Sequence, residues 1–141
     1  MESFIVRIDH VGVAVPDLAA AVDFHERVLG LQLLHQETNE EQGVAEAMMG
    51  FPGDPVRVQL LAPLTPDSPI AKFIEKSGAG LQQLAYTVTD VRAASEHFRS
   101  LGIRMLYDTP KRGTENSLIN FAHPKDCGGV LIELVEPARR N

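Results

Sequence analysis

The chain has 141 residues, which suits one domain or two small structural modules fused around a shared core. Hydrophobic residues make up 44% of the chain and charged residues 23%, an ordinary globular composition that excludes a disordered or collagen-like protein. The formal net charge of -6 excludes a general attraction to nucleic acid or anionic lipid. No apolar run approaches the roughly 20 residues of a membrane span, and the N-terminus does not read as a secretion signal. We therefore expect a soluble, cytoplasmic protein.

The sequence contains an internal repeat. Residues 8–17 (IDHVGVAVPD) align with residues 81–90 (LQQLAYTVTD) at an offset of 73. Residues 58–63 (VQLLAP) align with residues 132–137 (IELVEP) at an offset of 74. Two separate segments with nearly the same offset indicate a duplicated supersecondary unit.

The first unit is predicted to consist of a strand, a helix and then further strands. The helix begins after the N-cap Asp17, shows apolar residues at helical spacing, and ends before Gly30, which can adopt the left-handed conformation. Further strands are expected around Met48 and at residues 56–62.

A shorter helix is predicted from the N-cap Ser68, with Pro69 at its first position, to about Gly78. We expect it to bridge the two units. The second unit then repeats the first, with a helix between the N-cap Asp90 and Gly102. Strands around residue 119 and at residues 130–135 complete it.

Four polar side chains occupy mid-strand positions that the repeat relates in pairs. His10 aligns with Gln83, and Gln59 aligns with Glu133. Each stands in a strand face of small or apolar residues, where a polar group is costly unless it is hydrogen-bonded or bound to a ligand. A pseudo-twofold axis would gather all four on one concave face. Imidazole, two amides and a carboxylate suit an exchangeable divalent cation better than a closed structural zinc site.

At this point the sequence resembles the methylmalonyl-CoA epimerases of the vicinal oxygen chelate superfamily. The stretches that carry the resemblance are NEEQGVAEAMM (39–49), VQLLAPL (58–64), SPIAKFIEKSGAGLQQLAYTV (68–88), LYDTPKRG (106–113) and HPKDCGGVLIELVEP (123–137). They cover nearly the whole chain in register. The resemblance implies an α+β fold of two tandem βαβββ modules, about residues 5–64 and 80–137, which form a cupped, incomplete eight-stranded barrel.

The resemblance also implies a metal site and an activity. The implied ligands of one divalent ion per chain are His10, Gln59, Gln83 and Glu133. Cobalt is the first expectation for the metal, ahead of manganese, nickel, zinc and magnesium. Glu46 and Glu133 are implied as the acid/base pair that removes and returns the 2-proton of methylmalonyl-CoA through a metal-stabilised enediolate. Many members have consecutive histidines where this chain has Gln82 and Gln83.

The residues themselves are consistent with these roles. Glu46 is a single charge among the small and apolar residues of 43–49, and a desolvated carboxylate binds its proton more tightly and is a stronger base. A solvated edge-strand position is the alternative. Coenzyme A carries phosphates, and the chain has no Walker or Rossmann glycine pattern. The candidate substrate contacts are therefore local cations and one histidine: Lys111, Arg112, His123 and Lys125, with Arg139 and Arg140 as further candidates.

Two other functions stay open from the sequence. A glyoxalase I-like isomerase of the same superfamily would use a similar metal and a glutamate base. A metal-free binding protein of the drug-resistance kind would keep the paired modules without a complete ligand set, and Gln83 keeps this alternative open. An extradiol dioxygenase needs two histidines and a carboxylate on iron, of which only His10 is present. The resemblance further implies a homodimer that acts in propionate metabolism.

Overall fold

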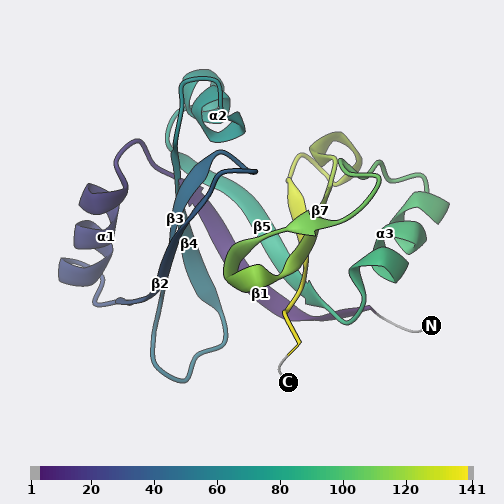
Figure 1. Cartoon of the computed structure of the whole chain (residues 1–141), viewed down its shortest axis with the longest axis horizontal. Helices are drawn as coiled ribbons and strands as arrows, with labels where there is room; N and C mark the ends of the chain where they lie inside the picture. Colours follow the sequence, from purple (N-terminus) through teal and green to yellow (C-terminus); the bar gives the residue numbers. More distant parts are fainter. Residues whose placement is uncertain (1–3, 140–141) are drawn as a thin grey trace. The chain divides into compact units, whose positions relative to one another are not determined.

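The computed structural model describes residues 4–139 (Figure 1). The chain forms two compact units. One comprises His10–Gln82, and the other combines the chain up to Asp9 with the chain from Gln83 onward. Strand β1 (Ile5–Ala14) contributes to both units. The predicted modules differ on this point, because they place the whole of β1 in the first module.

The unit His10–Gln82 has the order of elements that the sequence predicts. Its elements after β1 are α1 (Leu18–Arg27), β2 (Gln32–Asn39), β3 (Val44–Gly50), β4 (Arg57–Pro63) and α2 (Pro69–Ser77). The strand order is β2-β3-β4-β1, with β4 parallel to β1 and antiparallel to β3. Helix α2 packs on β4 within this unit, although the sequence suggested a bridge between the two repeats.

The second unit repeats this topology. Its elements are β5 (Gly80–Val88), α3 (Val91–Ser100), β6 (Lys111–Arg112), β7 (Leu118–Ala122) and β8 (Ile132–Glu136), with 3₁₀ turns at Thr114–Asn116 and Pro124–Asp126. The strand order is β6-β7-β8-β5, and β8 is parallel to β5 as β4 is to β1. The βαβββ arrangement predicted for each half is therefore confirmed. Strand β6 is much shorter than its counterpart β2.

The three predicted helix N-caps are confirmed. The capping bonds are Ala20 N–H to Asp17 Oδ1 (3.1 Å), Ala71 N–H to Ser68 Oγ (3.1 Å) and Ala93 N–H to Asp90 Oδ1 (3.0 Å). Each satisfies a backbone donor that the first helical turn leaves without a partner. After α3 the chain turns at Gly102, whose φ of +83° is the left-handed conformation expected of it.

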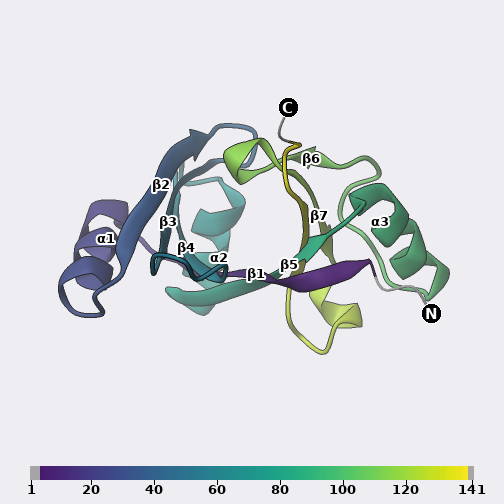
Figure 2. The same ribbon diagram turned by 90° about the horizontal axis from the view of Figure 1, so that it is seen from below.

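In each unit the strands pack against a helix on one face. In the first unit Val13 and Val15 contact the cluster that includes Leu18 and Val22 of α1, as the alternation of β1 predicts. In the second, the buried Val88 joins a cluster with apolar residues of α3. Figures 1 and 2 both show α1 beside β2–β4 and α3 beside β7, each within its own unit. The strand faces that turn away from α1 and α3 carry the four polar residues that the repeat relates in pairs, namely His10, Gln59, Gln83 and Glu133. No helix within residues 4–139 has the length and apolar character to span a membrane.

Candidate active site

In the first unit a buried carboxylate is held by an amide. Glu46 lies on β3 and Gln59 on β4, and each is only 4% exposed. Gln59 pairs directly with Met48, two residues from Glu46, so the two polar side chains lie diagonally on the same face. The Gln59 Nε2 group donates a hydrogen bond of 3.0 Å to Glu46 Oε2. The edge-strand alternative for Glu46 is therefore wrong, because β3 lies between β2 and β4.

His10 lies on this same face of the first unit. It is 2% exposed and stands two residues before Gly12, which pairs with Gln59 across the parallel β1 and β4. Small residues at positions 12 and 14 accompany it, as the sequence predicts. The first unit thus places an imidazole, an amide and a carboxylate on one face of its sheet.

The second unit contains a comparable pair. Gln83 on β5 is 8% exposed and Glu133 on β8 is 5% exposed. Glu133 pairs with Ala85, two residues after Gln83, so the two side chains share a face. The Gln83 Nε2 group donates a hydrogen bond of 2.8 Å to Glu133 Oε1. Both units therefore bury an amide against a carboxylate.

The strand registers support the alignment of the two repeats. Gly12 pairs with Gln59 just as Ala85 pairs with Glu133, which makes Gln59 and Glu133 equivalent. The third strands differ at the chemically important position, because the counterpart of Glu46 is the apolar Ile119. The two carboxylates thus occupy non-equivalent positions, one in each unit.

One part of this surface was missed by the sequence analysis. Strand β2 places Glu37 directly opposite Glu46, and its carboxylate Oε1 lies 3.0 Å from His35 Nε2. The alternation of His35, Glu37 and Asn39 is the sequence signal that could have identified them. A register shift between Leu33 and His35 interrupts the pattern on the N-terminal side.

The cationic side chains that are predicted to contact the substrate lie at the surface of the second unit. Lys111 and Arg112 form the exposed strand β6. The Lys111 Nζ lies 4.4 Å from the centre of the Tyr107 ring, a cation–π contact. Tyr107 in turn packs edge-on against Phe121, which pairs with Glu133. Aromatic rings thus connect Lys111 to the strand pair that carries Glu133.

The turn before β8 has its own internal bonds. His123 Nδ1 accepts the backbone N–H of Lys125 at 3.1 Å, so the histidine caps the short 3₁₀ turn. Two side-chain hydrogen bonds and a backbone hydrogen bond from Arg104 to Asp126 lower the pKa of that carboxyl to about 2. Desolvation raises the pKa of the half-buried Cys127 thiol, which disfavours the reactive thiolate. Lys125 and Arg139 are exposed, and Arg140 lies outside the described residues.

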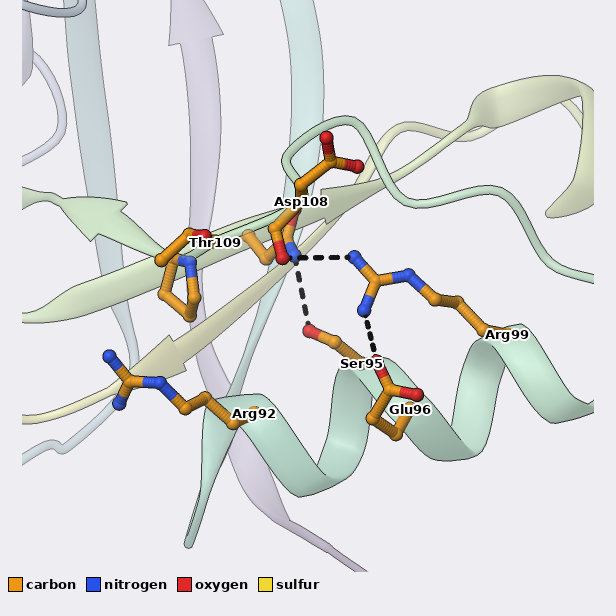
Figure 3. A pocket seen from close by; sticks show the side chains of 8 residues that line it. Arg92, Ser95, Glu96, Arg99, Asp108 and Thr109 are labelled. Atoms are coloured by element: carbon orange, nitrogen blue, oxygen red, sulfur yellow. Dashed lines mark hydrogen bonds and ion pairs between the residues drawn. The ribbon is translucent and has the colours of Figure 1, made fainter.

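A cavity of about 260 Å³ lies elsewhere in this unit, between α3 and the segment 108–110 (Figure 3). Its floor contains the buried Ser95 and Asn120, which hydrogen-bond to each other at 3.1 Å. Asn120 precedes Phe121 on β7, so it faces α3, whereas Glu133 lies on the other face of the sheet. This cavity is therefore separate from the Gln83–Glu133 pair of the same unit.

The chemistry of the predicted ligands fits a divalent cation. Both amide nitrogens donate to carboxylates, so Gln59 and Gln83 would bind a cation through their amide oxygens. Together with His10 and Glu133 they form a nitrogen and oxygen set that suits exchangeable divalent metals. Among residues 4–139 no three His, Cys, Asp or Glu side chains are grouped closely enough to hold a metal ion. The predicted set instead takes half of its ligands from amides.

Comparison with known proteins agrees with the resemblance in sequence. Residues 9–121 match the Glyoxalase/Bleomycin resistance protein/Dioxygenase superfamily. The ethylmalonyl-CoA/methylmalonyl-CoA epimerase of Cereibacter sphaeroides is 37% identical over 91% of this chain and 96% of that protein. Methylmalonyl-CoA epimerase from Mycobacterium tuberculosis is 51% identical, with a TM-score of 0.94 over 99% of this chain and 93% of that one.

A third comparison includes a bound molecule. A variant of the Streptomyces coelicolor methylmalonyl-CoA epimerase, in complex with 2-nitronate-propionyl-CoA, is 44% identical. The match covers 96% of this chain and 99% of that one, with a TM-score of 0.91. These similarities confirm the α+β glyoxalase fold. The chain therefore belongs to the glyoxalase/bleomycin resistance/dioxygenase superfamily and, within it, to the methylmalonyl-CoA epimerase family.

Proposed function

We propose that this protein is an isomerase that interconverts (2R)- and (2S)-methylmalonyl-CoA. The observation that carries the proposal is the pair of buried carboxylates, Glu46 and Glu133, each held by a glutamine. They occur in a chain that is similar over nearly its whole length to epimerases of this substrate. Epimerisation requires a proton to leave one face of the 2-carbon and a proton to return from the other. Two acid/base groups are therefore needed.

Glu46 supplies the first of these groups in the proposed mechanism. Its burial removes water that would otherwise solvate the carboxylate, and the hydrogen bond from Gln59 fixes the orientation of the group. It takes the proton from the 2-carbon, where the two flanking carbonyl groups make the proton acidic. The electrons left on the carbon delocalise into the thioester and carboxylate oxygens of the substrate.

Glu133 supplies the second group. It returns a proton to the opposite face of the planar carbon, and in the reverse reaction it removes one. Its hydrogen bond from Gln83 orients the carboxylate as the Gln59 bond orients Glu46.

We also propose that His10, Gln59, Gln83 and Glu133 hold one divalent metal ion. Support comes from their burial, from the donor atoms that they offer, and from the repeat, which relates His10 to Gln83 and Gln59 to Glu133. When bound, such an ion would supply a Lewis acid to stabilise the enediolate charge of the substrate. Cobalt as the native metal, the homodimer, the cytoplasmic location and a place in propionate metabolism stay predictions of the resemblance.

The anionic parts of the substrate need cations, and we propose Lys111 and Arg112 as the first of them. Lys111 is held against Tyr107, whose ring packs on Phe121 beside Glu133 in the strand register. This chain of contacts gives Lys111 a defined place relative to one proposed acid/base group. His123 and Lys125 are weaker candidates, because the His123 ring already caps its own turn.

The proposed activity is tested by hydrogen exchange. The protein is loaded in turn with Co²⁺, Mn²⁺, Ni²⁺, Zn²⁺ and Mg²⁺ and incubated with (2R)-methylmalonyl-CoA in D₂O. We expect deuterium at the 2-position, formation of the (2S) epimer, and loss of both after chelation.

A parallel assay with methylglyoxal and a thiol tests the glyoxalase alternative, and metal analysis of untagged protein tests the metal-free binding alternative. Turnover of the hemithioacetal with no deuterium in methylmalonyl-CoA would replace the epimerase proposal by the first. Tight binding of a small molecule without metal or exchange would replace it by the second.

A further inference from the structure

We propose that Glu37 and His35 form a proton path that connects Glu46 with solvent. This inference rests on the proposed function, because it assumes that Glu46 takes a proton from the substrate. The observation that supports it is that both residues lie on β2, where Glu37 is the direct register partner of Glu46. Neither residue belongs to the acid/base pair or to the predicted ligand set.

The strand register places the two carboxylates on one face of the sheet. Glu37 and Glu46 are direct partners in the antiparallel pair β2–β3. The Cβ atoms of such partners lie about 4.5–5.5 Å apart, which is within reach of a direct or water-mediated proton transfer between carboxyl groups.

The exposed fraction of the side chain increases from Glu46 through Glu37 to His35. Glu46 is 4% exposed, whereas the side chains of Glu37 and His35 are 19% and 37% exposed. The Glu37 Oε1 and His35 Nε2 atoms are 3.0 Å apart, so the last two groups are already hydrogen-bonded. The three residues therefore lead step by step from a buried base to a ring that contacts water.

The reaction itself creates the need for such a path. After a turnover in one direction, the group that removed the proton is protonated and the group that donated one is ionised. Both must return to their starting states before the next turnover in the same direction. Glu46 is buried, and its amide neighbour Gln59 donates a hydrogen bond rather than accepting one. An adjacent carboxylate is therefore a suitable acceptor for the proton that Glu46 holds.

The transfers balance without any further reactant. The O–H bond of protonated Glu46 breaks and an O–H bond forms on Glu37, which restores the Glu46 anion. Glu37 then gives the proton to Nε2 of a neutral His35 ring that carries hydrogen on Nδ1. The resulting imidazolium releases its Nδ1 proton to water. Exchange with water later returns the ring to its first tautomer.

The test uses the metal-loaded protein with Glu37→Gln, which keeps the shape of the side chain but cannot carry the proton. Resetting of Glu46 follows product release, so loss of the path lowers kcat and KM together. We expect kcat to fall about 10-fold or more and kcat/KM to stay within about twofold. Added imidazole or formate, as small proton carriers, should restore kcat. With substrate deuterated at the 2-carbon, more label should return to recovered substrate and less should reach solvent.

Two control variants separate this role from a structural one. Glu37→Asp retains a carboxylate and should recover at least part of kcat. Gln36→Ala alters an exposed residue on the opposite face of the same strand and should behave as wild type. A Glu37→Gln enzyme with unchanged kcat, or with equal losses in kcat and kcat/KM that no buffer restores, would overturn the proton path. Absence of epimerisation in the wild type would instead overturn the proposed function.

Discussion

The two units of this chain share one topology and differ in where they place polar groups. In the first, β3 carries Glu46 and the strand beside it carries Glu37. In the second, the residue equivalent to Glu46 is Ile119, and β6 has only two residues. The second unit instead places its carboxylate on the last strand, as Glu133. Duplication has thus supplied a common frame, and divergence has left each copy with one buried carboxylate at a different position.

The second unit also uses polar groups on the helix side of its sheet, where the first uses apolar packing. Asn120 is fully buried between β7 and α3, and its counterpart Ala47 belongs to an apolar cluster with α1 residues. Despite this polarity, α3 buries three of its residues, whereas α1 buries none. A buried polar group on the helix side of the sheet is therefore compatible with a well-buried helix when its hydrogen bonds are made.

The largest expected effect on activity comes from replacing Glu46, which has no carboxylate counterpart in the second unit. Glu46→Gln keeps the size of the side chain and removes the base, so epimerisation should fall by about 10³-fold. Deuterium exchange into one epimer should persist, because Glu133 still removes the proton from its own side. Exchange is measured by NMR or mass spectrometry in D₂O for each epimer separately.

The matched control is Glu41→Gln, which removes an exposed acid from the neighbouring turn and should leave the rate unchanged. Full epimerisation by Glu46→Gln would exclude this residue from the mechanism. The chemical asymmetry of the two units would then have to reside in Glu133 alone.

The sequence was sufficient to predict where the helices of both units begin and which of their strands are equivalent. Asp17, Ser68 and Asp90 are capping residues whose side chains bond within three residues, so their effect is local and readable from sequence. The repeat identified the equivalent strands because the offset holds across two distant segments. These features depend on short-range chemistry or on direct comparison of the chain with itself.

The hydrogen-bonded pairs of the site could not be predicted in the same way. All but one residue of β3 is buried, so Glu46 stands in a strand without the alternation that identifies one face. Its contact with Gln59 depends on the register between β3 and β4, which no local pattern reveals. The opposition of Glu37 and Glu46 depends on register too.

The next effect concerns the buried polar network of the second unit. Asn120 donates to Ser95 Oγ and to the Tyr107 carbonyl, and its Oδ1 accepts the N–H groups of Tyr107 and Phe121. Asn120→Ala removes these four hydrogen bonds and leaves a cavity at a fully buried position, so the free energy of unfolding should fall by about 2–3 kcal/mol. Urea unfolding measures it. Ser95→Ala removes only one member of the network and should lower the free energy of unfolding by less. If Asn120→Ala lowers it by no more than Ser95→Ala does, the network is not important for stability.

A smaller effect is expected for metal affinity when the equivalence of His10 and Gln83 is restored. Imidazole is a stronger donor to borderline divalent metals than an amide oxygen. Gln83→His should therefore lower the Kd for Co²⁺ by about 10-fold, and His10→Gln should raise it by a similar factor. Calorimetric titration or competition with a chelator measures both without reference to activity. Unchanged affinity in both variants would remove these two residues from the ligand set.

Acid stability should distinguish the second unit at the turn before β8. Hydrogen bonds from Arg104 lower the pKa of Asp126 from 3.8 to about 2, and the counterpart of Arg104 in the first unit is Leu31. A lowered carboxyl pKa stabilises the fold above the ordinary value, and the stabilisation is lost as pH falls from about 4 to 2. Asp126→Asn should thus lose its deficit relative to wild type over that interval. A deficit independent of pH would contradict this assignment.

The smallest expected effect exploits a hydroxyl that only one unit possesses. Thr87 Oγ1 donates to Asp9 Oδ2 at 2.6 Å, and the repeat relates Thr87 to Ala14 and Asp9 to Gln82. With alanine at position 14 this donor is missing, and the buried Oε1 atom of Gln82 has no hydrogen-bond partner. Ala14→Ser should supply one and raise the free energy of unfolding by about 0.5–1 kcal/mol.

The control for this substitution is Ala47→Ser, which places a hydroxyl in an apolar cluster and should destabilise by about 1–3 kcal/mol. Combining Ala14→Ser with Gln82→Leu should abolish the gain, because a double-mutant cycle isolates the bond between the two positions. If Ala14→Ser costs as much as Ala47→Ser, the new hydroxyl does not reach Gln82. The correspondence between the two units would then hold for their strand registers and fail for this pair of side chains.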